Sequence, residues 1–303
     1  MSVEVSSGEQ VRASSEAVPA KPRRDLTTLL FRIWAIAIYA FLFLPILIIV
    51  VYSFNRGRAL LAWEGFGLDW YTTLPDNPVI LDAITTSLKA AVGSAIIATV
   101  VGSLAGIALA RRPGRWVVVF MAIVFLVLVT PEIVDAIALL IWYVRIKGPF
   151  GPSNTLVNYG LVRLWMGHAL FSTAVVTLIV RARLAGLDES LEEAGADLYA
   201  PPWRRFRQIT LPLMLPAVLA GALLAFSLSL DNTIISTFVS VAGASPWPVY
   251  VFSALRSILR PEIAAVSTLM LLLTLLALSM VALVLRRGGD SAEDVAKTIT
   301  GAG

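Results

Sequence analysis

Three carboxylates interrupt stretches of sequence that are otherwise apolar. Glu132 and Asp135 follow Pro131, and Asp231 precedes Asn232 within a second apolar stretch. A carboxylate at the centre of a bilayer costs on the order of 2.5–3.5 kcal/mol on insertion scales, so such groups normally face protein or a water-filled path. Glu132 and Asp135 are three residues apart, which places both on one face of a helix. Acids directed at one cavity would suit a cationic substrate that carries several amines.

Neighbouring side chains either extend this interpretation or compete with it. The rings of Trp142 and Tyr143 lie further along the stretch that holds Glu132, where they could add cation–π contacts to an amine. Aromatic residues are also common interface anchors in membrane helices. A different possibility is that Lys89 neutralises one acid in an internal ion pair. The candidate substrate path comprises Asp231, Asn232, Glu132, Asp135, Trp142 and Tyr143.

Several residue patterns that enzymes need are absent from the sequence. There is no cysteine, which excludes disulfides, thiolate nucleophiles and cysteine-based metal sites. There is no GxxxxGK[ST] phosphate loop, HExxH or GxSxG. The single histidine, His168, is predicted to be a packing or interfacial residue. We therefore expect a chain that is not an enzyme and that binds no metal or cofactor itself.

The composition is that of a membrane protein. Of the 303 residues, 58% are hydrophobic and 15% are charged, and a bilayer-spanning helix needs about 20 mainly apolar residues. The stretches 116–128 and 269–285 have no polar face, unlike the amphipathic helices of a soluble core. We predict an all-α, polytopic protein with six transmembrane helices near residues 29–52, 83–110, 116–144, 164–180, 213–241 and 263–285.

Basic residues predict the orientation of these spans. Arginine and lysine are concentrated in alternate connecting segments, which predicts that both termini are cytoplasmic. Residues 1–25 are polar and are expected to form a disordered cytoplasmic tail, followed by an uncleaved first span. The membrane domain is predicted at 26–287, with a second cytoplasmic tail at 288–303. The same bias accounts for the net charge of +4, so we infer no nucleic-acid binding.

The connection between the fourth and fifth predicted spans is unusually charged for so apolar a chain. Residues 188–198 predict a short helix with an acidic first turn, ended by Pro201-Pro202, and residues 203–209 predict a short basic helix. Tyr199 and Trp203 should lie near the bend, where aromatic and arginine residues favour a protein interface. The alternative is a connector along the headgroups, with Arg204, Arg205 and Arg207 binding anionic lipid.

This connection resembles the EAA loop of bacterial ABC importer permeases. Glu193, Ala194 and the Ile209-x-Leu211-Pro212 segment match its pattern, whereas Gly195 replaces an alanine and Tyr199 a glycine that ends one helix. The resemblance implies that the loop docks on a separate ATPase chain, which would hold the ATP and magnesium. The implied coupling residues are Glu193, Ala194, Gly195, Tyr199, Ala200, Trp203, Ile209, Leu211 and Pro212.

Further motifs resemble spermidine/putrescine permeases of the C-subunit type. They are Ser53-Phe54-Asn55, Trp63-Glu64-Gly65-Phe66, Trp70-Tyr71, residues 130–134, Ser229-Leu230-Asp231-Asn232, Pro248-Val249-Tyr250 and residues 260–263. The resemblance implies a type I ABC importer permease fold in the bacterial inner membrane. It also implies a second permease subunit, two ATPase chains and a periplasmic binding protein as partners, and transport by alternating access.

One departure from this subfamily keeps the substrate open. Many of its members have two consecutive acids where this chain has Asp231-Asn232. An opine, an amino acid or an aminophosphonate therefore remains an alternative to a polyamine. More distant alternatives are an ATP-independent channel or carrier, which would be active by itself, and a membrane scaffold, in which the acids would be replaceable.

Overall fold

The computed structural model describes residues 26–57, 62–112, 114–150, 160–256 and 261–287, and the two predicted tails lie outside them. The regular elements of these ranges are helices, with isolated bridges at Asn55–Phe66 and Val241–Ala244. The elements are α1 (Leu26–Tyr52), α2 (Asp69–Thr73), η1 (Leu74–Asp76), α3 (Pro78–Arg111), α4 (Arg115–Val129), α5 (Glu132–Phe150), α7 (Gly160–Ala185), α8 (Ser190–Asp197), α9 (Pro202–Arg205), η2 (Phe206–Thr210), α10 (Leu211–Leu230), α11 (Ile234–Val239), α12 (Trp247–Ala254) and α13 (Pro261–Arg287).

Within the described ranges, five helices are long and apolar enough to cross a membrane, and a bent helix pair would make a sixth span. The five are Thr27–Tyr52, Pro78–Arg111, Gly160–Ala185, Pro202–Leu230 and Pro261–Leu285. The third predicted span, 116–144, is not one straight helix, because α4 and α5 meet at an angle of 102°. The break lies at Pro131, since Thr130 is extended (ψ 129°) and a residue before proline disfavours the helical region.

The fifth predicted span, 213–241, also differs from the structure. α10 ends at Leu230, and the short helix α11 begins only at Ile234. Side chains in this gap bond to the backbone: the Thr233 hydroxyl donates to the Asp231 carbonyl at 3.3 Å, and Asn232 accepts from the Ser236 amide at 3.4 Å. Such bonds compete with a helical ladder. Asp231 therefore lies at the end of α10 and not inside a continuous helix over 213–241.

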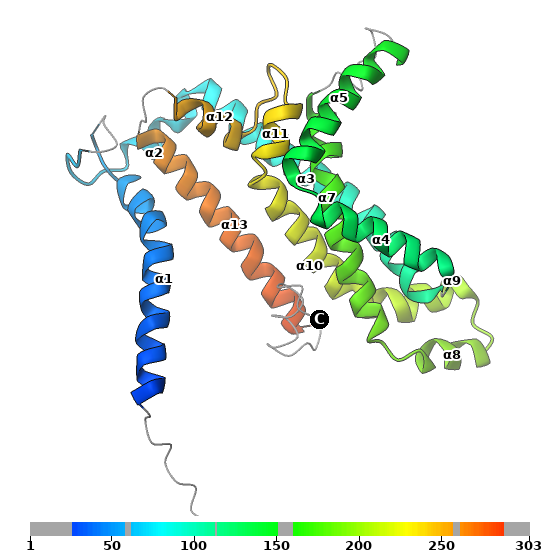
Figure 1. The fold of residues 1–303 in the computed structure, drawn as a ribbon. Helices are drawn as coiled ribbons and strands as arrows, with labels where there is room; N and C mark the ends of the chain where they lie inside the picture. The colour runs from blue at the N-terminus through cyan, green and yellow to red at the C-terminus, as the bar shows by residue number, and fades with distance from the viewer. Residues whose placement is uncertain (1–25, 58–61, 113, 151–159, 257–260, 288–303) are drawn as a thin grey trace, which may run out of the picture. The chain divides into compact units, whose positions relative to one another are not determined.

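The chain divides into two compact units, residues 1–48 and 49–303, and the second contains all the features described below. Its centre is formed by α3, α7 and α10, with α13 packed against α10 (Figure 1). A buried cluster of mostly small side chains joins the three central helices, including Ala98, Val176 and Ala225. Small side chains let helices approach closely, which is a principal source of association between helices in a membrane.

Glycines on α3 set the distance between α3 and α7. A Cβ atom added at Gly102 would lie 2.8 Å from Val176 Cβ and 2.9 Å from the Thr173 carbonyl oxygen. One turn further, a Cβ at Gly106 would lie 2.9 Å from both Val180 Cβ and the Thr177 carbonyl. Since real Cβ atoms do not approach backbone this closely, only glycine fits at these two crossings.

Replacing Gly102 with valine is expected to destabilise the pairing of α3 and α7. Overpacking of this kind costs about 1–3 kcal/mol, and it should appear as a lower midpoint of thermal unfolding in detergent. Gly186→Ala is the matched control, because a Cβ there has nothing closer than 3.7 Å. Equal midpoints for the two variants would contradict the close packing at Gly102.

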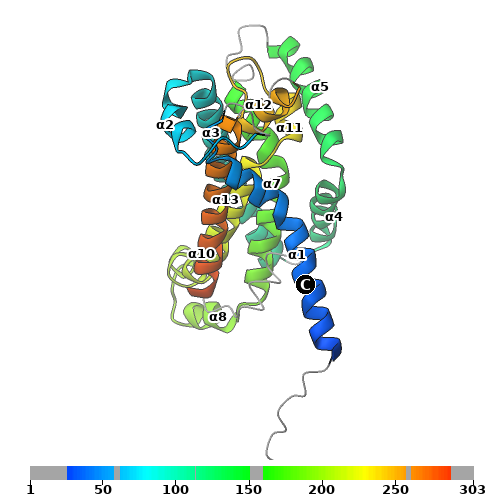
Figure 2. The ribbon, with the colours of Figure 1, turned by 90° about the vertical axis from the view of Figure 1, so that its left-hand side faces the viewer.

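α10 connects the two regions of functional interest. Its N-terminus continues from η2 of the charged connection 188–212, and its C-terminus carries Asp231. Figures 1 and 2 show α8 at one end of the central helices and α11 and α12 at the other. A 20-residue helix is about 30 Å long, so α10 links the charged connection to Asp231 across roughly the thickness of a bilayer.

Candidate functional site

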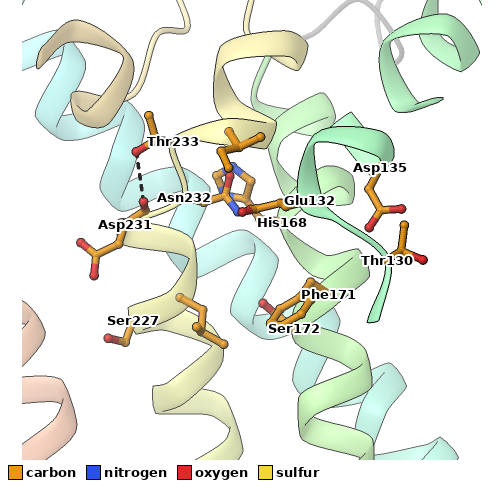
Figure 3. Close-up of a pocket in the computed structure, with 12 residues that line it drawn as sticks. Thr130, Glu132, Asp135, His168, Phe171, Ser172, Ser227, Asp231, Asn232 and Thr233 are labelled. Atoms are coloured by element: carbon orange, nitrogen blue, oxygen red, sulfur yellow. Dashed lines mark hydrogen bonds between the residues drawn. The ribbon is translucent and has the colours of Figure 1, made fainter. Parts of the chain in front are cut away.

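A cavity of about 450 Å³ lies beside the break after α10. Both predicted acids of α5 line it, as do the residues that follow α10 (Figure 3). Its lining residues are Thr130, Glu132, Asp135, His168, Phe171, Ser172, Ser227, Leu228, Asp231, Asn232, Thr233 and Ile234. Two chain breaks, at Pro131 and after Leu230, thus bring together acids that are about a hundred residues apart in sequence.

A continuous set of hydrogen bonds runs from the cavity into the core. Asn232 donates from Nδ2 to Glu132 Oε1 at 2.5 Å, and its Oδ1 accepts from the Ser236 amide. The buried His168 ring shares hydrogen bonds with both Ser236 Oγ, at 2.9 Å from Nε2, and Ser229 Oγ, at 2.6 Å from Nδ1. His168 therefore ties α7 to the end of α10 and to α11, and this fixes the break that positions Asn232 and Glu132.

Asp231 occupies a different place from Glu132. In Figure 3 its carboxylate points away from Glu132. A second cavity of about 340 Å³ is lined by Asp231 and Thr233 together with Trp247, Phe252 and other residues of α12 and α13. Asp231 thus lies where two cavities meet. No ion pair or side-chain hydrogen bond of its carboxylate occurs within the described ranges.

The remaining members of the predicted substrate path lie elsewhere. Trp142 and Tyr143 are not among the residues that line the cavity. Tyr143 is buried, donates its hydroxyl to the Arg163 carbonyl at 3.0 Å, and receives the Arg163 guanidinium over its ring at 5.1 Å. The alternative role for Lys89 is also not seen, because Lys89 is in none of the ion pairs found within the described part of the chain.

The connection 188–212 forms two short helices that meet at a sharp bend. α8 ends in a Schellman motif, in which the Ala200 amide donates to the Gly195 carbonyl at 3.1 Å and the Tyr199 amide to the Ala196 carbonyl at 2.8 Å. Tyr199 has φ 57°, a left-handed conformation that favours glycine. Helix termination therefore occurs at Tyr199 itself, and the prediction that Pro201-Pro202 takes over this role is wrong.

The face of this connection that points away from the bundle is exposed. Glu193 and Ala194 are exposed on α8, while Leu198, Tyr199 and Trp203 are 83%, 96% and 70% exposed around the bend. Hydrogen bonds from the backbone amide and side chain of Ser190 lower the pKa of Asp188, which keeps this carboxyl ionised at the acidic start of α8. The bend thus presents aromatic and aliphatic side chains beside acidic ones.

Other predicted coupling residues hold the connection together. A Cβ added at Gly195 would lie 3.1 Å from Ile209 Cδ1 and 3.3 Å from Arg205 Cγ, so α8 crosses η2 at very short range. Ala200 is half-buried between the two helices, and Leu211 and Pro212 form the first turn of α10. Motion of the exposed bend can therefore pass directly into α10.

Comparison with known proteins agrees with this arrangement. Residues 98–290 match the family described as binding-protein-dependent transport system inner membrane component. The chain belongs to this family. It is 37% identical over 245 residues to the putrescine transport system permease protein PotI of Escherichia coli K12, which covers 78% of this chain and 85% of that protein.

A second relative supports the family assignment, and a solved structure shares the fold. The spermidine/putrescine transport system permease protein PotC of Haemophilus influenzae is 35% identical over 250 residues, covering 82% of this chain and 94% of that protein. A bacterial ABC transporter that imports the acidic polysaccharide alginate has a TM-score of 0.66 at 14% identity, covering 86% and 95% of the two chains, which shows the fold alone. This inner-membrane component is thus a multi-pass transport subunit with the all-α fold of ABC importer permeases, as predicted.

Two residues of this transport subunit have roles that the sequence did not suggest. His168 was interpreted as a packing or interfacial residue, yet it organises the hydrogen bonds beside the cavity. Arg111 was counted only as a basic residue, yet it binds two acids of the connection 188–212. Neither has a local signal in sequence, because their partners come from distant segments.

Replacing His168 with phenylalanine is expected to destabilise the cavity wall of this permease. Two buried hydroxyls, of Ser229 and Ser236, would lose their shared partner, at roughly 1–3 kcal/mol for each group left unpaired. The thermal midpoint in detergent should fall, and transport should fall with it because Asn232 loses its support. His168→Gln keeps one donor and one acceptor and should retain more of both. A phenylalanine variant as stable as the wild type would contradict the role of this histidine.

Proposed function

We propose that this chain is one of two permease subunits of an ATP-driven importer of polyamines such as putrescine and spermidine. The observation that carries the proposal is Asp231, a carboxylate without an ion-pair partner in the described structure, at the meeting of two cavities. Glu132 and Asp135 add negative charge on one side, and Trp247 and Phe252 add aromatic rings on the other. An elongated molecule with several ammonium groups matches this distribution, through charged hydrogen bonds and cation–π contacts.

The relatives support the same substrate class. PotI is named for putrescine and PotC for spermidine and putrescine, and both match most of this chain. Cavities of about 450 and 340 Å³ are of the size that small-molecule sites usually have. Trp142 and Tyr143 are left out of the proposed path, because neither lines the two cavities. The Arg163 guanidinium also already lies over the Tyr143 ring.

The proposal includes partners that supply the energy and the substrate. Two ATPase chains would bind on the cytoplasmic side and hold the ATP and magnesium, so this chain needs no cofactor of its own. A second permease would complete the membrane path, and a periplasmic protein would deliver the substrate. Both termini would be cytoplasmic, which places the connection 188–212 on the side of the ATPases.

The exposed bend of the connection supports docking of an ATPase. Tyr199 holds a conformation that costs about 1–2 kcal/mol for an L-residue other than glycine, and it is 96% exposed in the described structure, so packing there does not offset this cost. Aromatic side chains are favoured anchors at protein interfaces. Closure of the ATPases would push on this bend and move α10, so that the cavities open alternately to the two sides.

Uptake of labelled putrescine and spermidine tests the proposed function. Cells that carry the complete transporter would be compared with cells that lack only this chain. We expect uptake to be lost, restored by the wild-type chain, and not restored by Glu193→Lys. Unchanged uptake in the deleted strain would exclude polyamines, and the same strains would then be assayed with opines, amino acids and aminophosphonates. Uptake by the purified chain alone in liposomes would instead indicate an ATP-independent carrier.

A further inference from the structure

We propose that Arg111 is a positioning residue that clamps the connection 188–212 to α3, so that α3 moves together with α10 when an ATPase pushes on the bend. This inference rests on the proposed coupling role of the connection. It assigns to α3, which is remote from that connection in sequence, a direct part in the transmission of movement.

The geometry around Arg111 is that of a forked ion pair. Arg111 Nη1 lies 2.7 Å from Glu189 Oε1, and Nη2 lies 2.8 Å from Glu192 Oε1. The Arg111 side chain is only 17% exposed. It lies in the last turn of α3, where the helix dipole stabilises a positive charge. By contrast, the pair of Arg56 and Asp69 is 3.4 Å long with both side chains more than 60% exposed. Of the two acids, Glu192 is 29% exposed and Glu189 is 68% exposed, so the pair with Glu192 is the shielded one and is expected to contribute more.

Glu192 extends the clamp to the start of α10. Its Oε1 also accepts a hydrogen bond from the Thr210 hydroxyl at 2.9 Å, and Thr210 is the buried last residue of η2. One carboxylate oxygen therefore joins the end of α3, the first turn of α8 and the base of α10. Removing any of these partners leaves a shielded charge or hydroxyl without its bond, which is costly.

This arrangement has a mechanical consequence. The connection is covalently continuous with α7 and α10 but not with α3, whose chain leads away to α4. α3 packs closely along α7 and α10 through small residues. The two bonds from Arg111 add polar links between the end of α3 and the connection itself. Without them, ATPase closure would move the connection relative to the end of α3, and ATP would be hydrolysed without full opening.

The test measures the substrate imported per ATP hydrolysed by the complete transporter in proteoliposomes, with putrescine as substrate. For Arg111→Ala we expect this ratio to fall by at least about fivefold, the lower end of typical coupling between sites. ATPase activity itself should persist, because the exposed docking surface is intact. Arg112→Ala is the matched control, since its exposed side chain makes no hydrogen bond in the described part of the chain, and its ratio should equal that of the wild type.

Two further variants keep the proposal open to contradiction. Arg111→Lys keeps the charge but replaces the planar, two-nitrogen fork by a single ammonium nitrogen, which should hold the two carboxylates less firmly and give an intermediate ratio. If Arg111→Ala fails to assemble into the transporter, the ratio measured for Arg111→Lys is the one that tests the clamp. A wild-type ratio in Arg111→Ala, or in Arg111→Lys if the alanine variant does not assemble, would overturn the clamp. If Glu193→Lys uncouples while these variants do not, coupling through the connection stands and only the role of Arg111 is wrong. If none of them changes the ratio, the proposed coupling is wrong as well.

Discussion

Replacing Asp231 with asparagine is expected to reduce putrescine uptake at least tenfold. The side chain keeps its size, but the cavities lose the one carboxylate that both share. A hydrogen bond to a charged group contributes about 1.5–3 kcal/mol, and about 1.4 kcal/mol corresponds to a factor of ten in affinity. The measurement is the concentration dependence of labelled putrescine uptake, in which the loss should appear mainly as a higher half-saturating concentration.

Matched variants separate a binding role from a general effect of charge. Asp76→Asn removes one negative charge from an exposed residue of η1, outside both cavities, and should leave uptake unchanged. Asp231→Glu keeps the charge and should retain part of the uptake. ATP hydrolysis should remain close to wild type in Asp231→Asn, since the connection 188–212 is intact. Normal uptake by Asp231→Asn would remove this residue from the substrate path.

Reversing the charge of Glu193 is expected to abolish transport at the other end of α10. Glu193 is exposed on α8, so lysine at this position should leave the fold of the chain intact. A like-charge contact placed in an interface costs several kcal/mol, enough to prevent productive docking of an ATPase. We expect Glu193→Lys to insert normally, and to lower both uptake and binding of the ATPase to the purified permease.

The variant Glu193→Gln tests the same surface with a smaller change in charge. It should bind the ATPase with a smaller loss, because it removes a charge without introducing repulsion. Asp76→Lys, which makes the same reversal in η1, should bind the ATPase normally. Normal ATPase binding and uptake by Glu193→Lys would mean that this face of α8 does not contact the ATPase, whatever the resemblance to the EAA loop implies.

The two proposed roles lie at opposite ends of one helix. Asp231 lies at the C-terminal end of α10, and the connection that carries Glu193 leads into its N-terminus. The helix between them is about 30 Å long and contains Pro216. On the proposed coupling, a displacement of the connection would reach the cavity through this one helix.

The sequence by itself determined the class of protein, the helices and the presence of the charged connection. These features are local: the length of an apolar stretch, the position of a proline or the pattern of the EAA loop can be read within some twenty residues. Helix bounds such as Pro78–Arg111 and Pro261–Arg287 lie within a few residues of the apolar stretches that predicted them. The same holds for the acids Glu132 and Asp135, which line one cavity as their spacing predicts.

Only the tertiary structure decided which polar groups meet. The apolar stretch 213–241 reads as one span, but the backbone bonds of Asn232 and Thr233 end the helix at Leu230 and carry Asp231 to the meeting of two cavities. The Tyr143 ring makes its cation–π contact with Arg163, and Arg111 forms ion pairs with acids in a segment nearly eighty residues away in sequence. Hydrophobicity indicates which stretches form long apolar helices. The breaks in these helices and the faces they turn to one another depend on close packing and on bonds between distant residues, for which a single sequence has no periodic signal.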